Sequence, residues 1–128
     1  MKSLSDYVQK NQSEIFKNFG VFFAFSNKQY SERAVEGVEY VNTSGCFIPR
    51  NNFKKYYDAM EKCQKDGIDQ DIKENGKFAI IRRELFNYEC FYTYEIQDAI
   101  DNLEQYGYND TDIMEVFNNV RENENVDD

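Results

Sequence analysis

The sequence of 128 residues contains no histidine. Without an imidazole side chain, Ser-His-Asp and Cys-His catalysis are excluded, and so is a histidine general base near neutral pH. A zinc ion would also lack its usual nitrogen ligands. An enzyme with this composition would depend on carboxylates, Lys, Tyr or Cys alone. The first hypothesis given below is a non-enzymatic protein with no catalytic residues, no metal site and no cofactor.

Cysteine is scarce: Cys46, Cys63 and Cys90 lie far apart, and no CxxC pair occurs. Such an odd, scattered set fits neither a disulfide framework nor a zinc site. We interpret these residues as small buried hydrophobic side chains in a reducing compartment. The sequence also lacks an apolar run of the roughly 20 residues that span a bilayer and the apolar block of a secretory signal. Together these absences predict a cytoplasmic protein.

Proline and glycine are few, with one proline and six glycines, which argues against a chain with several linkers. The length suits one domain with a single modest core. We therefore predict a single domain over residues 1–120 and an acidic, flexible tail over residues 121–128. Tryptophan is absent, but 16% of the residues are aromatic, so we expect the core to consist largely of Phe and Tyr.

Negative charge is unevenly distributed along the chain. Residues 1–66 contain ten Lys/Arg and eight Asp/Glu, a net charge of +2, whereas residues 67–128 contain five and sixteen, a net charge of −11. An acidic half disfavours direct binding to nucleic acid and suits a basic protein partner. The alternative is that the acidity only keeps the protein soluble.

The hydrophobic pattern predicts an α+β fold in which short antiparallel strands pack against helices. An amphipathic helix is expected from about Leu4 to Asn18, ended by Gly20. In "VFFAFS", apolar side chains alternate to both faces, which indicates a strand whose aromatic residues are buried on both faces. Ser26 is a candidate cap of the helix that follows. The predicted strands cover about residues 21–26, 38–42 and 46–48.

The C-terminal half is predicted to be helical. One helix begins near residue 51 and ends at Gly67, and a polar, solvated connection with at most one helical turn follows over residues 68–77. The last two helices are expected to be capped by Thr93 and Asn109 and to form a helical hairpin.

Two segments carry a shared pattern: "FFAFSNKQY" (Phe22–Tyr30) and "ELFNYECFYTYEIQDAIDNL" (Glu84–Leu103). They resemble a family of small proteins encoded by phages, plasmids and other mobile elements. Its members carry Phe-Phe-Ala-Phe-Ser-Asn followed by Gln and an aromatic residue, and later Glu-Leu, Asn-His-Glu and Thr-Tyr-Asp. Tyr88 stands where the family usually has His, and Glu95 where it has Asp. The resemblance implies a setting: small acidic proteins of mobile elements often antagonise host defence, including CRISPR effectors.

Our first hypothesis is a non-enzymatic, anti-CRISPR-like inhibitor in the host cytoplasm. Its acidic C-terminal face would bind a basic surface of a host protein, such as a nucleic-acid-guided nuclease, without contacting nucleic acid or a membrane. This acidic face consists of Glu95, Asp98, Asp101, Glu104, Asp110, Asp112 and Glu115.

Two alternatives stay open. One is a small-ligand-binding or enzymatic domain, in which polar groups of the family motif converge beside the aromatic strand and Tyr88 forms a wall. The polar groups of this cluster are Asn27, Gln29, Tyr30, Asn87 and Glu89. The same groups can instead cap helices and satisfy buried backbone. The other alternative is an accessory interaction domain of unknown partner.

Overall fold

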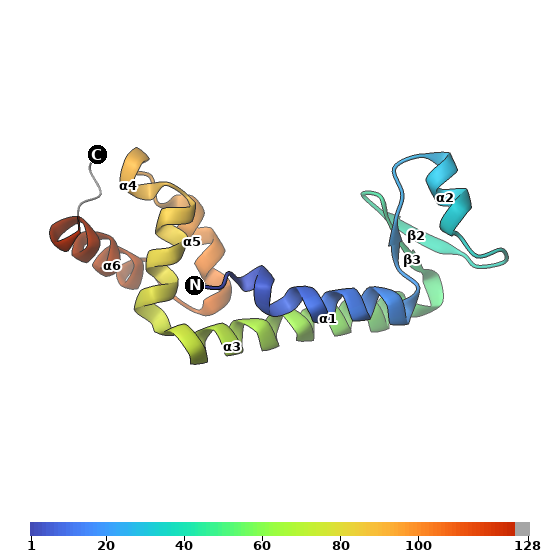
Figure 1. Cartoon of the computed structure of the whole chain (residues 1–128), viewed down its shortest axis with the longest axis horizontal. Coiled ribbons are helices and arrows are strands. Elements are labelled where there is room, and N and C mark those ends of the chain that lie inside the picture. The colour runs from blue at the N-terminus through green and yellow to red at the C-terminus, as the bar shows by residue number, and fades with distance from the viewer. Residues whose placement is uncertain (125–128) are drawn as a thin grey trace. The chain divides into compact units, whose positions relative to one another are not determined.

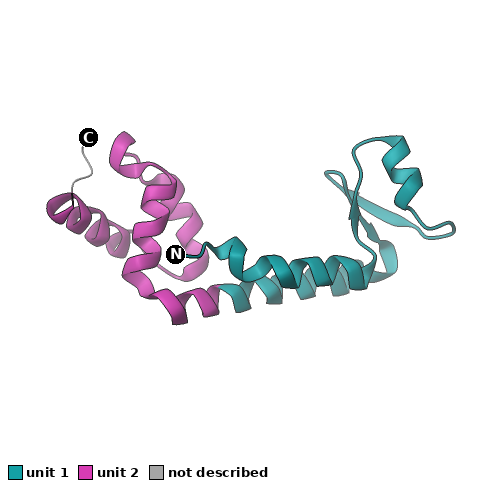
Figure 2. Cartoon of the chain, viewed as in Figure 1, with its two compact units in different colours: residues 1–67 teal, residues 68–128 magenta. Residues whose placement is uncertain are grey.

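The computed structural model describes residues 1–124. It combines helices with a small antiparallel sheet, which confirms the predicted α+β fold (Figure 1). The chain divides into two compact units, Met1–Gly67 and Ile68–Asp128 (Figure 2). This division falls within the region that the sequence analysis treats as a single domain, residues 1–120.

The first unit begins with α1 (Leu4–Phe19), at the position predicted from the sequence. The Ser3 N–H donates a hydrogen bond to Asp6 Oδ2 at 2.8 Å, which places a carboxylate in the first turn, where the helix dipole favours it. Gly20 ends the helix with a φ of 69°. Glycine adopts this left-handed conformation without steric cost, so the predicted end of the helix is confirmed.

The sheet of the first unit is antiparallel with the strand order β1-β3-β2. Each strand overlaps a predicted one, although β1 is shorter than expected. The three strands are β1 (Phe22–Phe23), β2 (Tyr40–Thr43) and β3 (Cys46–Pro49). Ser44 and Gly45, with φ values of 50° and 89°, form the tight turn between β2 and β3.

The aromatic run at β1 is not buried on both faces, contrary to the prediction. Phe23 is 45% exposed and Phe25 is 77% exposed, whereas Phe22 stacks on Phe47 with 5.4 Å between the ring centroids. The reason is the position of β1 at the edge of the sheet, where a strand has one neighbour and its side chains meet fewer packing partners.

Ser26 caps α2 (Asn27–Arg33), as predicted, because its hydroxyl accepts a hydrogen bond from the Gln29 N–H at 3.2 Å. After β3, a short 3₁₀ turn, η1 (Arg50–Asn52), leads into the next helix. The core of the first unit lies between the sheet and the helices around it. Its buried members are Val21, Cys46, Ile48 and Tyr56.

The long helix α3 spans Phe53–Asn87. Gly67 lies inside it, so the predicted helix end at this residue is wrong. The predicted connection over residues 68–77 is also helical, apart from a kink at Gly76, where φ is 79° and ψ is 165°. Gly67 is needed for packing instead: a Cβ at this position would clash with Cγ1 of Val8 on α1.

The second unit continues after α3 with four short elements. These are α4 (Cys90–Thr93), α5 (Gln97–Leu103), η2 (Glu104–Tyr106) and α6 (Asp110–Asn123). Thr93 does not cap α5, because it ends α4 and Tyr94 then adopts a left-handed φ of 61°. Asn109 does cap α6, since its Oδ1 accepts a hydrogen bond from the Asp112 N–H at 2.9 Å.

The core of the second unit is largely aliphatic, with Phe91, Tyr106 and Phe117 buried as well, whereas the composition predicts a core largely of Phe and Tyr. Aliphatic side chains fill the interior because they pack between helices without a polar atom to satisfy. The fully buried apolar residues are Ile80, Ile81, Leu85, Cys90, Ala99, Leu103, Ile113 and Val120.

The C-terminal end differs in part from the predicted tail. Helix α6 continues to Asn123, beyond the expected start of the tail at residue 121. The rest of the predicted tail, residues 125–128, lies outside the described residues. No helix within residues 1–124 combines the length and the apolar character that a membrane crossing requires.

Candidate functional site

The first part of the predicted acidic face lies on α5 and η2. Asp98, Asp101 and Glu104 follow one another at intervals of three residues, and their side chains are exposed. Glu95 precedes α5 and is exposed as well. Asp101 accepts a hydrogen bond from Gln97 Nε2 at 2.8 Å. Within residues 1–124 none of the four carboxylates forms an ion pair, so their charges are open to solvent.

The second part of the acidic face lies on α6, where the three carboxylates differ. Asp110 is exposed in the first turn. Asp112 is paired with Lys77 and accepts a hydrogen bond from the Asn109 N–H at 3.1 Å. These hydrogen bonds, first that from Lys77, lower the pKa of Asp112. Glu115 is exposed and, with Lys77, lines a shallow hollow of about 370 Å³. Asp112 therefore serves the fold, and Asp110 and Glu115 extend the exposed acidic surface.

Cations of the second unit are mostly engaged within the unit. Residues 67–128 contain five Lys/Arg, of which Lys77 is paired with Asp112. Arg82 is paired with Glu124, with 3.0 Å between Nε and Oε2, and Arg83 is used in the interior. The net charge of −11 over residues 67–128 thus resides largely on exposed carboxylates.

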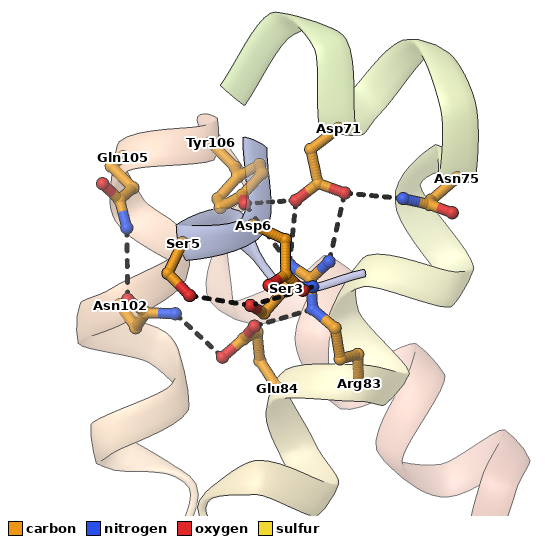
Figure 3. Close-up of polar contacts among 10 residues, drawn as sticks. All are labelled: Ser3, Ser5, Asp6, Asp71, Asn75, Arg83, Glu84, Asn102, Gln105 and Tyr106. Atoms are coloured by element: carbon orange, nitrogen blue, oxygen red, sulfur yellow. Dashed lines mark hydrogen bonds and ion pairs between the residues drawn. The ribbon is translucent and has the colours of Figure 1, made fainter. Parts of the chain in front are cut away.

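A buried polar cluster connects α3 to η2 and α5 in the second unit (Figure 3). Asp71 is fully buried, and Glu84 is 7% exposed. Arg83 lies between these carboxylates: Nη1 and Nη2 donate to Asp71 at 3.1 and 2.9 Å, and Nε donates to Glu84 Oε1 at 2.8 Å. The arrangement is a bidentate ion pair extended by a second carboxylate.

Amide and hydroxyl groups complete this cluster. Asn75 Nδ2 donates to Asp71 Oδ1 at 2.8 Å, and the Tyr106 hydroxyl donates to Asp71 Oδ2. Asn102 Nδ2 donates to Glu84 Oε2 at 3.0 Å. Each carboxylate oxygen of Asp71 and Glu84 therefore has a partner, and the cluster is suited to fixing one arrangement of helices rather than to binding a substrate.

The pKa values in the cluster also indicate a structural role and not a catalytic one. Burial alone would raise the pKa of Asp71, but hydrogen bonds from Arg83, Tyr106 and Asn75 outweigh it and hold the pKa below its usual value. Burial opposes the charge of Arg83, yet its carboxylate partners raise the pKa. Burial, and then the hydrogen bond to Asp71, raise the pKa of Tyr106. None of these three groups is poised to exchange a proton near neutral pH, as a general acid or base would be.

Asp71 is not among the residues predicted to be functional, because the polar composition of residues 68–77 predicts a solvated connection. A usable signal is present in the sequence. If the segment is helical, Ile68, Asp71, Ile72 and Asn75 recur at the i, i+3, i+4, i+7 spacing of one helix face. A carboxylate among apolar positions of such a face predicts a buried charge that needs a cationic partner.

The residues of the predicted polar cluster are divided between the two units. Asn27, Gln29 and Tyr30 belong to the first unit, and Asn87 and Glu89 to the second. Gln29 stabilises the start of α2, since its Oε1 accepts a hydrogen bond from the Phe25 N–H at 2.8 Å. Tyr30 packs on Phe47, with 4.8 Å between the ring centroids, and lines with Asn27 a hollow of about 480 Å³. Gln29 thus has the helix-capping role given above as the alternative.

The predicted cluster residues of the second unit lie where α3 ends and α4 begins. Asn87 is the last residue of α3 and is exposed. Glu89 is also exposed and adopts a left-handed φ of 54°. Tyr88, between them, is 40% exposed. This segment therefore presents its side chains at the surface of the second unit.

Cys46, Cys63 and Cys90 are free and buried, as predicted. Burial, as the main cause, raises the pKa of each thiol, which disfavours the reactive thiolate. In the described part of the chain, no three His, Cys, Asp or Glu side chains are grouped as ligands of a metal ion.

Comparison with known proteins gives a match over almost the whole chain. A family model described as a family of unknown function, DUF7659, matches residues 4–123. The chain belongs to this family. The match extends from the first residue of α1 to the last residue of α6, so DUF7659 includes both units. No curated protein and no solved structure matches the chain.

Proposed function

We propose that this DUF7659 protein is a non-enzymatic inhibitor that binds a basic surface of a host protein. The observation that carries the proposal is the set of exposed carboxylates around α5, which form no ion pair within residues 1–124. The cations that could have balanced them are engaged elsewhere, Lys77 with Asp112 and Arg82 with Glu124. A surface with unbalanced negative charge attracts and orients a basic partner.

A nucleic-acid-binding surface is the kind of basic surface that fits best. Such surfaces present Lys and Arg side chains to a series of phosphates. Asp98, Asp101 and Glu104 are three residues apart, so they offer negative charges at intervals of about 4.5 Å along the helix axis. The protein would occupy the groove in place of the nucleic acid. The resemblance to proteins of phages and other mobile elements supports a defence protein in the host cytoplasm, such as a nucleic-acid-guided nuclease, as the target.

The test removes the charges around α5 and compares the result with an equal loss of charge in the first unit. The α5 variant carries Glu95→Gln, Asp98→Asn, Asp101→Asn and Glu104→Gln. The unit 1 control carries Glu14→Gln, Glu32→Gln, Glu36→Gln and Glu61→Gln, which are exposed as well. The free energy of unfolding of each variant should lie within about 0.5 kcal/mol of the wild-type value, because exposed carboxylates contribute little to stability.

The wild type and both variants are used to capture proteins from a host lysate, and the affinity for the captured protein is then measured with purified components. We expect the α5 variant to bind at least about tenfold more weakly and the unit 1 control to bind like the wild type. The captured protein should also lose its nucleic acid to the wild type in a competition assay. An equal loss of affinity in both variants would mean that only net charge matters, and the proposal would be wrong.

A further inference from the structure

Two exposed tyrosines accompany α4 in the second unit. Tyr92 is 81% exposed and Tyr88 is 40% exposed. Neither ring stacks on another ring or on a cation within residues 1–124. Glu89 and Glu95 lie in the same eight-residue segment, are exposed and form no ion pair in the described chain. We call Tyr88, Glu89, Tyr92 and Glu95 the α4 surface.

Buried side chains and a backbone hydrogen bond hold α4 in place beneath the α4 surface. Cys90 is fully buried and Phe91 is 5% exposed, and Phe91 stacks on Phe117 of α6 with 5.1 Å between the centroids. The Tyr92 N–H donates to the Glu89 carbonyl at 3.0 Å. Because the backbone of α4 is held by these contacts, the Tyr92 ring is directed outward before any partner arrives. A preorganised aromatic side chain loses little entropy on binding.

The aromatic residues that flank Tyr88 and Tyr92 in the sequence already have arginine partners. The Arg82 guanidinium lies 4.7 Å from the centroid of Phe86, and that of Arg121 lies 5.0 Å from the centroid of Tyr94. Tyr88 and Tyr92 stand between Phe86 and Tyr94 in the sequence, and neither has an aromatic or cationic ring partner within residues 1–124. The electrons of a ring face attract a guanidinium, and a nearby carboxylate accepts hydrogen bonds from its N–H groups.

We infer that the α4 surface binds arginine side chains of a basic protein partner. The guanidinium groups stack on Tyr88 and Tyr92, and they donate hydrogen bonds to the carboxylates of Glu89 and Glu95. This inference rests on the proposed function and adds the chemical class of the partner: rich in arginine rather than in lysine. Arginine is favoured because its planar guanidinium stacks on a ring and pairs with a carboxylate in a fork, which a lysine ammonium does not do.

Charge decides against nucleic acid as the occupant. Bases also stack on exposed tyrosines, but Glu89 and Glu95 would lie against the phosphates. Within residues 67–128, with a net charge of −11, the few cations are mostly engaged in ion pairs. An arginine-rich protein segment can both stack on the rings and pair with the carboxylates.

The test uses two probes of equal charge, an alternating Arg-Gly dodecapeptide and its Lys-Gly counterpart, with affinity measured by fluorescence anisotropy. The proteins are the wild type, Tyr88→Leu/Tyr92→Leu, and Tyr88→Phe/Tyr92→Phe, which keeps the rings. Phe25→Leu is the control, because Phe25 is an exposed aromatic residue of the first unit. Circular dichroism checks that each variant is folded.

The wild type should bind the arginine peptide about three- to tenfold more tightly than the lysine peptide. The Leu variant should lose this preference without losing affinity for the lysine peptide, and the Phe variant and Phe25→Leu should keep it. If wild type binds both peptides equally, or the Leu variant keeps the preference, the inference is wrong. If sedimentation shows a dimer that Tyr92→Leu dissociates, the occupant is a second copy of the chain, and the inference is wrong too.

A variant with Asp98→Asn, Asp101→Asn and Glu104→Gln separates this inference from the proposed function, because it leaves Glu95 of the α4 surface in place. If the two peptides bind alike and this variant weakens both, arginine preference is wrong while the acidic surface keeps its role. If this variant binds both peptides and the captured protein as tightly as the wild type does, the proposed function is wrong.

Discussion

Arg83 binds Asp71 through both terminal nitrogens, at 3.1 Å from Nη1 to Oδ1 and 2.9 Å from Nη2 to Oδ2. The two residues lie on opposite sides of the kink that Gly76 makes in α3. The ion pair therefore connects the two segments of the helix across its bend. Because a bidentate pair fixes direction as well as distance, it also orients the segment of α3 from which α4 follows.

Asp71→Asn should destabilise the protein by about 3 kcal/mol, because it leaves the buried Arg83 short of one carboxylate. The free energy of unfolding from urea denaturation measures this loss. Asp69→Asn is the matched control, since Asp69 is an exposed carboxylate on the same helix and its replacement should change stability by less than about 0.5 kcal/mol. Equal effects of the two substitutions would show that the pair across the kink is not stabilising.

Acid should weaken the same pair. The pKa of Asp71 is lower in the folded protein than its usual value, since hydrogen bonds from Arg83 and its other partners outweigh the effect of burial. A lowered pKa gives a stabilisation that is present above the unfolded pKa, about 3.9, and is lost as the pH falls through the folded pKa. The difference in unfolding free energy between wild type and Asp71→Asn should therefore shrink below about pH 4. A difference that is the same at pH 3 and pH 7 would contradict this.

Gly67→Ala should destabilise the first unit by about 1–3 kcal/mol through overpacking, although Ala favours a helix over Gly by about 1 kcal/mol. The reason is the clash that a Cβ at Gly67 would have with Val8. In a Val8→Ala background the clash is relieved, so Gly67→Ala should become neutral or stabilising there. A double-mutant cycle of unfolding free energies measures this coupling. Stabilisation in the wild-type background would rule out the close packing.

Alkaline pH should destabilise the protein through Tyr56. Burial, as the main cause, raises the pKa of Tyr56 to about 12, whereas an unfolded tyrosine titrates near about 10. A raised pKa gives a stabilisation that is present below the unfolded pKa and is lost as the pH rises from about 10 to the folded value. Tyr56→Phe should therefore show a smaller loss of unfolding free energy between pH 9 and pH 11 than the wild type. Equal losses would contradict this assignment.

The sequence predicts features that depend on a few neighbouring residues. Ser26 and Asn109 cap helices, and Gly20 ends one, because hydrogen bonds to the adjacent turn decide these positions. Gly67 has the same appearance as Gly20 in the sequence, but its contact with Val8, distant along the chain, decides its role. Local rules cannot distinguish the two glycines.

In the candidate site, too, some features can be predicted from the sequence and others depend on contacts between distant residues. The acidity of the second half and the carboxylates around α5 follow from the sequence alone, because charge is a property of composition. The pair of Asp71 and Arg83 does not, because its geometry depends on the kink at Gly76 and on burial. The exposure of Tyr92 depends on the left-handed residues on both sides of α4, which no local pattern indicates.

Binding of a basic partner by the carboxylates around α5 is tested most directly by the salt dependence of the affinity for the captured partner, measured for the wild type and for the α5 variant. Wild-type binding should weaken at least about tenfold between about 50 and 300 mM salt, since screening reduces attraction between exposed charges. The α5 variant should bind weakly with little dependence on salt. The same affinity and the same salt dependence for both proteins would contradict the claim.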